Sequence, residues 1–441
     1  MRIINTPYGS FPDYYQLDIL EDLCVKGIGI QTGPFGSQLH NSDYVSLGTP
    51  ILTVEHLGEN RILHENIPRV TDADRRRLSR YSIKKGDIIF SRVGSVDRRA
   101  LVRDGEEGWL FSGRCLRVRP DPEKLDSVFL SYLMGLPSFK EYIRKIAVGA
   151  TMPSINTEIL SDIPICYPPL PTQHAIARIL GSLDDKIELN RQMNATLEAM
   201  ARAIFQSWFM GFDPVRAKAE GRDTGLPQEF AALFPSEMVE VDGQKVPRGW
   251  GFVCISECCQ HVENGGTPRR DNPDYWDPPE IPWLTSGEVR QDIITSTENG
   301  ISKLGFENSS AKMWPKGTTV VALYGATAGQ VSFISVELCA NQACCALIPK
   351  DTLTYFNYLA MSSAVESLEN QASGSAQQNL SQKIVAEYKI CQPSQEILYQ
   401  FDKVVEPLFE IWISNTEQSC TLAQIRDALL PKLMSGEIQV T

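Results

Sequence analysis

The sequence predicts an α/β (α+β) protein of 441 residues in which a globular mixed α/β domain followed by a long helix occurs twice. Three observations support this prediction. A seam of apolar residues at heptad spacing marks one long helix, the same seam returns 225 residues later, and short strand and turn motifs repeat at similar offsets. We therefore expect two globular domains joined by two long helices that pair as an antiparallel coiled-coil spacer, with an internal pseudo-two-fold repeat.

The first long helix is predicted between His174 and Phe209, where apolar residues recur in alternating steps of four and three. Polar residues interrupt this seam only in its middle, at Asn190 and Asn194. The seam consists of Ile176, Leu180, Leu183, Ile187, Asn190, Asn194, Leu197, Ala201, Ile204 and Trp208. A seam of this length favours burial against a second helix, and a buried Asn fixes the register of such a pair at a cost in stability.

The second long helix follows from the first, because adding 225 to each seam position gives residues near the C-terminus. The resulting positions are Phe401, Val405, Leu408, Trp412, Asn415, Ser419, Leu422, Arg426, Leu429 and Leu433. Asn415 repeats Asn190, so even the polar interruption is reproduced. Two such seams most simply bury each other; the alternative is that each helix packs only on its own globular domain.

Each long helix is expected to bend near its start. Gly181-Ser182 in the first copy and Glu406-Pro407 in the second are the kinds of sequence at which helices kink. For the first copy we predict a short helix up to Leu180, a kink, and a straight segment from about Leu183 to Phe209. At about 1.5 Å per residue, that segment would be roughly 40 Å long.

The repeat also predicts how the chain is divided. The expected parts are a first globular domain at 1–170, a central helix at 171–212, a linker at 213–250, a second globular domain at 251–395 and a C-terminal helix at 396–441. Residues 85–90 correspond to 316–321 at an offset of 231, and residues 50–53 to 282–285 at 232. Drifting offsets indicate loop insertions between shared strands.

Within each globular half, strand and turn signals dominate. Runs rich in β-branched residues predict strands at 87–92, 115–118 and 319–324, separated by Gly, Pro and Asn clusters. Helices are expected at 127–146 and 353–370. These patterns predict a curved, largely antiparallel sheet in each half.

The charge balance limits the partners that the chain can bind alone. Its net charge is −12, and residues 1–170 carry equal numbers of basic and acidic side chains. A nonspecific polyanion binder would show a basic surplus, so nucleic-acid contacts must come from local patches or from a basic partner. No signal-peptide core is found, and Gly325, Gly329 and Gln330 interrupt the most apolar run, so a cytoplasmic location is expected.

The eleven cysteines include no CxxC pair. Cys258 and Cys259, with His261 two residues on, come nearest to half a metal site. However, Cys258-Cys259 aligns with Leu23-Cys24 at an offset of 235, which places these thiols at apolar positions of the repeat. Core thiols in a reducing compartment are the favoured interpretation, and no metal is expected.

Several short motifs then point to a family. They are Gly33-Pro34-Phe35-Gly36-Ser37-Gln38-Leu39, Lys85-Gly86-Asp87-Ile88-Ile89-Phe90-Ser91-Arg92, Ala203-Ile204-Phe205-Gln206-Ser207-Trp208-Phe209, Phe212-Asp213-Pro214-Val215, Gly265-Gly266-Thr267-Pro268, Tyr275-Trp276 and Ile281-Pro282-Trp283-Leu284. Their order and duplication resemble the specificity (S) subunits of type I restriction–modification systems, over nearly the whole chain.

The resemblance implies two target-recognition domains, each reading one half of a bipartite, asymmetric site in double-stranded DNA. The paired helices would act as a ruler and as the docking surface for two methyltransferase (M) subunits, and restriction (R) subunits would join that core. Adenine N6 methylation or cleavage would then be done by the partners. S-adenosylmethionine is expected on the M subunit, and no cofactor or catalytic residue in this chain. A spacer of roughly 40 Å exceeds one DNA turn of about 34–36 Å.

Candidate DNA contacts stand in turns of both halves. In the first half they are Gly33, Phe35, Ser37, Gln38, Ser91, Arg92, Gly94, Arg98 and Arg99. In the second half they are Thr267, Arg269, Arg270, Tyr324, Gln377, Gln378 and Asn379. Arg can pair with guanine or bind phosphate, and Asn and Gln suit adenine. The alternatives are solvated surface turns and capping roles. Arg75, Arg76 and Arg77, in a helix expected at 71–79, are as consistent with a solvated face as with phosphate contact.

Trp208, Phe209 and Phe212 are candidates for docking the M subunit, with core packing at the end of the helix as the alternative. Exposed aromatic side chains would favour docking, because an exposed apolar patch marks an interface.

Two other functions are less consistent with the sequence. An adenine methyltransferase needs an aromatic residue after a polar-Pro-Pro motif to stack the flipped base, yet Asp277-Pro278-Pro279 is followed by Glu280. A helical scaffold without a sequence-reading role would leave two large, diverging domains without a task. No P-loop, GxGxxG after a strand, or nucleophile elbow is present, which disfavours NTPase and hydrolase functions.

Overall fold

The computed structural model describes residues 3–34, 38–351, 353–371 and 379–440. The chain forms two compact units, the first comprising Met1–Ile187 with Thr421–Thr441 and the second Glu188–Cys420. Each long helix therefore contributes one part to each unit. This grouping differs from the predicted division, in which each long helix is a segment of its own, because the helix ends pack into the cores of the globular parts.

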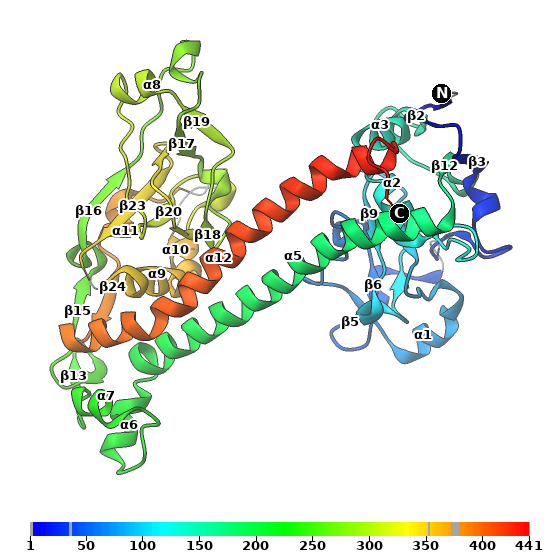
Figure 1. The fold of residues 1–441 in the computed structure, drawn as a ribbon. Coiled ribbons are helices and arrows are strands. Elements are labelled where there is room, and N and C mark those ends of the chain that lie inside the picture. The colour runs from blue at the N-terminus through cyan, green and yellow to red at the C-terminus, as the bar shows by residue number, and fades with distance from the viewer. Residues whose placement is uncertain (1–2, 35–37, 352, 372–378, 441) are drawn as a thin grey trace. The chain divides into compact units, whose positions relative to one another are not determined.

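The first unit is built on two small four-stranded sheets, and Figure 1 shows its strands in blue to cyan. One sheet has the order β4(Ile30–Thr32), β11(Cys115–Val118), β8(Ile88–Ser91), β9(Arg99–Leu101), and the other β10(Leu110–Phe111), β6(Thr49–Leu52), β7(Arg69–Val70), β5(Tyr44–Val45). Two further pairs are β1(Ile3–Thr6) with β2(Gly9–Pro12) and β3(Gln16–Ile19) with β12(Pro164–Tyr167). Only β10 and β6 run parallel among the described strands of this unit.

The globular part of the first unit also contains the helices α1(Asp72–Arg77), α2(Ser127–Leu133), α3(Pro137–Ile146) and α4(Thr157–Ser161). The helix expected at 127–146 is thus two helices, because Pro137 opens α3 at a position where the missing N–H costs nothing. The helix expected around Arg75–Arg77 is confirmed, with the Thr71 hydroxyl accepting a hydrogen bond from the Asp74 N–H at its start.

The second unit repeats this plan around a five-stranded sheet. Its order is β16(Cys259–Asn264), β23(Cys344–Pro349), β20(Thr319–Ala322), β21(Val331–Ile334), β18(Ile293–Ile294), beside a three-stranded sheet β19(Asn299–Ile301), β17(Ile281–Leu284), β22(Cys339–Ala340). The two-stranded pairs are β13(Met238–Val241) with β14(Gln244–Pro247) and β15(Gly251–Cys254) with β24(Lys389–Gln392). Its shorter helices are α6(Asp213–Ala219), α7(Gln228–Leu233), α8(Lys303–Glu307), α9(Thr354–Ser363), α10(Val365–Gln371) and α11(Gln382–Ala386).

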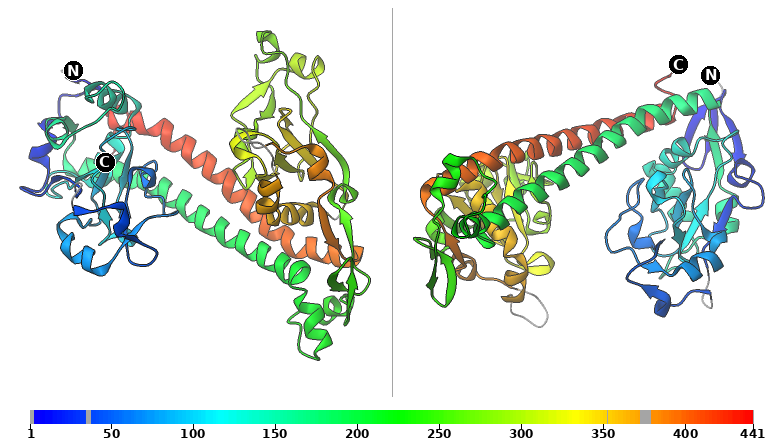
Figure 2. Two further views of the ribbon diagram at one scale, coloured as in Figure 1. Left: turned by 180° about the vertical axis from the view of Figure 1, so that it is seen from behind. Right: turned by 90° about the horizontal axis from the view of Figure 1, so that it is seen from below.

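The strand pairings confirm largely antiparallel sheets and a duplicated architecture. The parallel pair β10–β6 of the first unit corresponds to the parallel pair β22–β17 of the second, and the antiparallel pair β8–β11 corresponds to β20–β23. The helix expected at 353–370 is divided into α9 and α10 at Ala364. In Figures 1 and 2, α9 lies against the N-terminal half of the last helix, where Tyr355 stacks on Phe409 at 4.6 Å between ring centroids.

The long helices are α5(Leu170–Phe205), which ends in a π-helical turn Gln206–Met210, and α12(Gln395–Met434). Neither long helix is interrupted where a bend was predicted: α5 continues through Gly181-Ser182 and α12 through Pro407. Packing explains the second case: Val405 and Phe409 on either side of Pro407 are fully buried, and their burial outweighs one missing backbone hydrogen bond.

The two long helices pair antiparallel, as side-chain contacts within the second unit show. Asn190 Nδ2 donates to Ser419 Oγ at 3.2 Å, and Asn194 Nδ2 donates to Thr416 Oγ1 at 3.1 Å. Residue numbers therefore increase along α5 where they decrease along α12. Asn415 Nδ2 in turn donates to Asn194 Oδ1 at 3.0 Å.

The predicted seam is buried at its ends and polar in the middle. Ile176, Leu180, Ala201, Trp208, Phe401, Val405, Trp412 and Leu433 are buried, as are Asn190 and Asn415. Leu183, Ile187, Leu197, Leu408 and Leu422 are partly exposed, and Asn194 is half-buried. The middle of the pair is therefore held by amide and hydroxyl groups rather than by a continuous apolar stripe.

Candidate nucleic-acid interface

The candidate surface of the first unit lies where β6, β8 and β11 meet at their ends, next to the loop that follows β4. Three backbone hydrogen bonds hold this edge: Gly33 N–H to Cys115 O at 3.2 Å, Ser112 N–H to Leu52 O at 2.8 Å, and Arg92 N–H to Arg114 O at 2.9 Å. The approach requires glycine, because a Cβ on Gly33 would lie 2.2 Å from the carbonyl oxygen of Ser112.

A groove of about 740 Å³ opens at this edge, and both arginines line it. Arg92 is half-buried, and its guanidinium donates to the carbonyl oxygen of Gly113 at 3.2 Å and to Thr32 Oγ1 at 3.5 Å, so it stiffens the wall. Arg114 is exposed, and over the described part of the chain its guanidinium makes no hydrogen bond or ion pair. Its N–H donors are therefore available to a ligand in the groove.

Arg114 is the candidate that reasoning from the sequence missed. It stands in the turn Ser112-Gly113-Arg114 directly before β11, outside every motif that pointed to the family. The signal in the sequence was a Gly-Arg pair immediately before a predicted strand. The basic turn that was predicted comes instead immediately after a strand, β8. Only the sheet pairing of β8 with β11 brings the two turns together.

The basic turn after β8 is partly corrected by the structure. Ser91 is fully buried, with its hydroxyl donating to the carbonyl oxygen of Val93 at 3.3 Å. Arg99 is also buried and pairs with Glu59 at 2.7 Å, so neither side chain can reach DNA. Arg98 is exposed, and Gly94, at φ +81°, has open space where a Cβ would stand. The predicted turn exists, but it presents fewer side chains than expected.

The glycine-containing loop after β4 contributes Gly33 and Gln38 to the described structure. The Gln38 side-chain oxygen accepts a hydrogen bond from the Tyr81 hydroxyl at 2.9 Å, and its backbone oxygen accepts one from Arg77 at 2.7 Å. Gln38 thus anchors the loop to α1 and to the short helical turn Ser79–Tyr81 that follows it. Two further predicted contacts, Phe35 and Ser37, lie outside the described residues.

The second unit has the same framework at equivalent positions. The three matching backbone hydrogen bonds are Gly265 N–H to Cys344 O at 3.2 Å, Asn341 N–H to Leu284 O at 2.9 Å, and Leu323 N–H to Ala343 O at 2.7 Å. A Cβ on Gly265 would lie 2.2 Å from the carbonyl oxygen of Ala340, so glycine is required here too. The backbone is reproduced while the side chains differ.

Side chains at this second edge are mostly polar and uncharged. The Thr267 hydroxyl donates to the side-chain oxygen of Gln342, which stands in the turn before β23. Arg269 is exposed but pairs with Asp271 at 2.8 Å. Arg270 lies over Trp276, with the guanidinium carbon 5.1 Å from the ring centroid. Of the predicted contacts here, Thr267 borders the edge and the two arginines have partners within the loop.

Tyr324 and Asn379 are neighbours at this edge. They form an isolated antiparallel bridge, and Tyr324 is 42% exposed. Tyr324 precedes Gly325, whose φ of +80° and open Cβ space match those of Gly94 in the first unit. The predicted contacts Gln377 and Gln378 lie outside the described residues.

Trp208, Phe209 and Phe212 belong to the core of the second unit. Their exposed fractions are 4%, 4% and 8%, and the Phe209 ring packs on Phe401 at 4.8 Å between centroids. Trp250, at the other end of the linker, packs against Phe212 at 5.7 Å. The docking prediction for these three residues is thus corrected to core packing, because they have almost no exposed surface to offer a partner.

The cysteines that resembled half a metal site are core thiols. Cys258 and Cys259 are buried, and burial raises the pKa of the Cys259 thiol to about 12. In the part of the chain that the structure describes, no three His, Cys, Asp or Glu side chains gather as metal ligands would. Over the same residues, no helix combines the length and apolar character needed to cross a bilayer.

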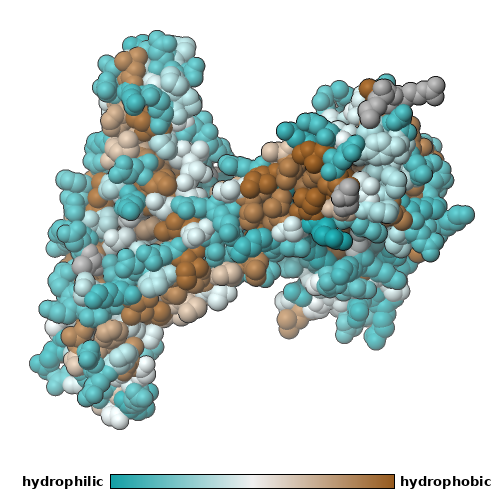
Figure 3. Space-filling view, viewed as in Figure 1, coloured by the Kyte–Doolittle hydropathy of each residue, from teal (hydrophilic) through white to brown (hydrophobic). Residues whose placement is uncertain are grey.

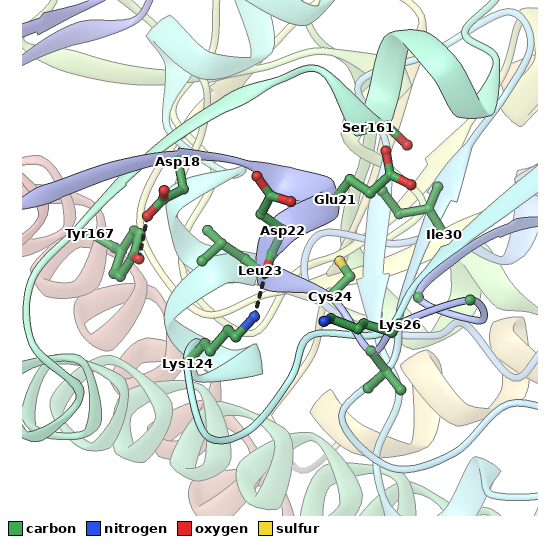
Figure 4. Close-up of a pocket in the computed structure, with 13 residues that line it drawn as sticks. Asp18, Glu21, Asp22, Leu23, Cys24, Lys26, Ile30, Lys124, Ser161 and Tyr167 are labelled. Carbon is green, nitrogen blue, oxygen red and sulfur yellow. Dashed lines mark hydrogen bonds between the residues drawn. The ribbon is translucent and has the colours of Figure 1, made fainter.

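A second pocket of the first unit, of about 780 Å³, is lined mainly by the segment from Glu21 to Ile30, with Asp18 of β3 and Tyr167 of β12 at one side (Figure 4). The Tyr167 hydroxyl donates to Asp18 at 2.6 Å, and Lys124 Nζ donates to the carbonyl oxygen of Asp22 at 2.8 Å. Glu21 and the other carboxylates outweigh the lysines on its walls. This lining disfavours phosphate, so the pocket is a weaker candidate for DNA binding than the edge with Arg92 and Arg114.

Comparison with known proteins agrees with this arrangement. Residues 36–199 and 247–411 each match the family described as "Type I restriction modification DNA specificity domain". The HindI specificity subunit of Haemophilus influenzae is 33% identical over 426 residues, covering 86% of this chain and 92% of the relative. The MjaIX specificity subunit of Methanocaldococcus jannaschii is 26% identical, covering 94% and 93%.

The fold itself has a solved counterpart. The crystal structure of the type I restriction–modification S subunit from M. genitalium superposes with a TM-score of 0.60 at 17% identity, over 99% of this chain and 100% of that one. At this identity the likeness concerns the fold alone. With two matched specificity domains and relatives aligned along most of its length, the chain belongs to the family of type I restriction–modification specificity subunits.

Proposed function

We propose that this chain is the non-catalytic DNA-recognition subunit of its complex and that each unit reads one half of a bipartite, asymmetric site in double-stranded DNA. One observation carries the proposal. The same backbone hydrogen bonds build the same strand edge twice, once with arginines and once with uncharged polar residues. A repeated framework with different side chains suits two readers of two different sequences.

The partners supply the chemistry in this proposal. Two methyltransferase subunits bind S-adenosylmethionine and methylate adenine N6, and restriction subunits add cleavage. This chain contributes the sequence reading, and the helix pair α5–α12 serves as the spacer. The role is supported by the relatives, which are named as specificity subunits of restriction enzymes.

Exposed apolar residues on the long helices are the docking surface we propose for the methyltransferase subunits. On α5, Leu189, Met193 and Met200 are 50%, 39% and 47% exposed. On α12, Ile425 is 43% exposed, and it stands 225 residues after Met200, at the same position of the repeat. Figure 3 shows apolar side chains gathered over the C-terminal turns of α12. An exposed apolar patch of this kind fits a protein partner.

The test of the function is methylation mapping at single-base resolution in cells with and without this chain. With an intact methyltransferase subunit present, a split, asymmetric adenine-methylation motif should disappear when the chain is deleted and return when it is restored. An unchanged methylome would contradict the proposal.

Docking is tested separately with Met200→Asp and Ile425→Asp. Each variant should lose about one methyltransferase subunit from the purified complex, measured by native mass spectrometry. The control is Ala195→Asp, which adds the same charge at an exposed position of α5 on the side opposite Met193 and Met200. Full retention of both subunits in both test variants would place the docking surface elsewhere.

A further inference from the structure

Resting on the proposed function, a finer assignment follows from the two strand edges. We infer that Arg114 and Gln342 are specificity-determining residues: Arg114 reads a guanine in one half-site, and Gln342 reads an adenine in the other. Both residues stand in the short turn that precedes the second strand in the order of their sheet, β11 in the first unit and β23 in the second.

The two turns are equivalent by backbone structure. Ser112 and Asn341 occupy the same place, because each donates its N–H to the last residue of a neighbouring strand and each carbonyl accepts from the first residue of β11 or β23. Gly113 therefore corresponds to Gln342, and Arg114 corresponds to Ala343. The framework fixes where the turn lies, and the side chains on it are free to differ.

In the first unit the turn presents a cation. Arg114 is exposed beside the groove of about 740 Å³, and Arg92, tied to Gly113 by a hydrogen bond of 3.2 Å, forms part of the wall next to it. A guanidinium offers two parallel N–H donors, which match O6 and N7 of guanine in the major groove. No other base presents two acceptors side by side there.

In the second unit the position equivalent to Arg114 is Ala343, and the position equivalent to Arg92 is Leu323, so both cations are missing. The exposed side chain of this turn is instead Gln342. Its side-chain oxygen accepts a hydrogen bond from the Thr267 hydroxyl, which orients the amide and leaves its N–H donors and one lone pair for a base. That pattern matches N6 and N7 of adenine.

Both edges are open to a close approach by DNA. Gly94 and Gly325, at equivalent positions of the turn after the neighbouring strand, have φ values of +81° and +80° and nothing within 4 Å of an added Cβ. Tyr324, directly before Gly325, is 42% exposed and lies on the same edge as Gln342. Among the described residues, the space beside these two glycines is therefore free for a ligand.

The experiment uses the full complex of this chain with its methyltransferase subunits and reads the methylated motif. Arg114→Ala should relax one guanine position of one half-site, so that sites with another base there gain methylation relative to guanine sites by about tenfold or more. The other half-site should stay unchanged. Arg216→Ala, which removes an exposed arginine on α6 that does not line the groove, is the matched control.

Gln342→Ala should relax an adenine position in the opposite half-site by a similar factor, with Gln395→Ala at the exposed start of α12 as its control. The inference is overturned if either variant lowers methylation uniformly without changing base preference, because that pattern identifies a phosphate contact or a structural role. It is also overturned if the motif does not change. A wild-type complex with no split motif would instead contradict the proposed function itself.

Discussion

At the scale of single residues, equivalent positions of the repeat can carry opposite chemistry. In the first unit, Arg426 on α12 pairs with the buried Asp184 on α5 at 2.6 Å, and the Tyr132 hydroxyl donates to the same carboxylate at 2.5 Å. Removing 225 from Arg426 gives Ala201, and adding 225 to Asp184 gives Phe409, both fully buried in the second unit. The Arg426–Asp184 ion pair of the first unit is therefore replaced by buried apolar residues at the equivalent positions of the second unit.

The ion pair between Arg426 and Asp184 can be tested by removing its cation. Arg426→Met should lower the free energy of unfolding of the first unit by about 3 kcal/mol, because it leaves the Asp184 carboxylate buried without its cation. Chemical denaturation measures the change. The double variant Asp184→Asn with Arg426→Met should recover most of the loss, since the buried charge is then gone. Equal loss in both variants would show that packing, rather than charge, is responsible.

The second residue-scale prediction concerns pH. Asp402 on α12 is largely buried at the start of α9, and burial raises the pKa of its carboxyl from 3.8 to about 7, against the lowering effect of the N–H groups of Phe356, Thr354 and Tyr355. Between these values the folded state keeps a proton that the unfolded state has lost. Stability contributed by this group therefore falls as pH rises from about 4 to 7 and stays constant above.

Asp402→Asn should consequently be more stable than the wild type at pH 8, by about 2 kcal/mol, and the difference should vanish towards pH 4. Thermal unfolding across this pH range measures it. Glu410→Gln, which removes a negative charge from an exposed position of the same helix, is the control. A constant difference between the Asp402→Asn variant and the wild type at every pH would contradict the assignment.

At the scale of elements, the helix pair α5–α12 is fixed in the second unit by a buried amide. Asn190 has no exposed surface, and its Nδ2 donates to Asn415 O at 3.2 Å, Gln418 Oε1 at 2.9 Å and Ser419 Oγ at 3.2 Å. These bonds can form in one register only, because they join one residue of α5 to a single turn of α12. Asn190 therefore defines how the helices align.

The element-scale prediction follows from those contacts. Asn190→Ala should lower the free energy of unfolding by roughly 2 kcal/mol, because it leaves a cavity and removes the hydrogen bonds that join α5 to α12 at this point. Denaturation in urea measures the effect. The matched control is Gln192→Ala, which removes an exposed amide from the same helix. If both variants unfold at the same urea concentration, the buried amide makes no net contribution.

At the scale of the whole molecule, the charge balance limits what the chain does alone. The net charge is −12, and the candidate surface of the second unit has arginines that are paired with Asp271 or stacked on Trp276. Such a protein neutralises few phosphates of DNA, so the release of counterions contributes little to its binding free energy. Tight binding to DNA must therefore draw on basic surface from the methyltransferase partners.

The whole-molecule prediction is that the isolated chain binds its own DNA site only weakly, with a shallow dependence on salt. Adding the methyltransferase subunits should increase affinity by about a hundredfold or more and steepen that dependence, because new phosphate contacts are made. Gel-shift titrations at several salt concentrations measure both quantities. Nanomolar, site-specific binding by the chain alone at physiological salt would contradict it.

The duplicated architecture could be predicted from the sequence alone. Heptad spacing and repeated strand motifs are local, periodic signals, so the long helices, the strand at Cys115–Val118 and the antiparallel character could be predicted from them. The loop at Gly33 and the turn after β8 were named as candidate DNA contacts from the resemblance and from their basic and glycine residues, and that role remains a prediction. Repetition made each weak motif informative, because it occurred twice in the same order.

Which side chains face the candidate DNA surface could not be predicted, because it depends on how the strands pair and pack. Ser91 and Arg99 flank the turn that contains Arg98, yet both are buried. Arg114 lies beside that turn only because β8 pairs with β11. Likewise, burial of Val405 and Phe409 carries α12 through Pro407 without a break. The burial of these side chains depends on contacts between residues far apart in the chain. The spacing of residues in a turn does not specify those contacts.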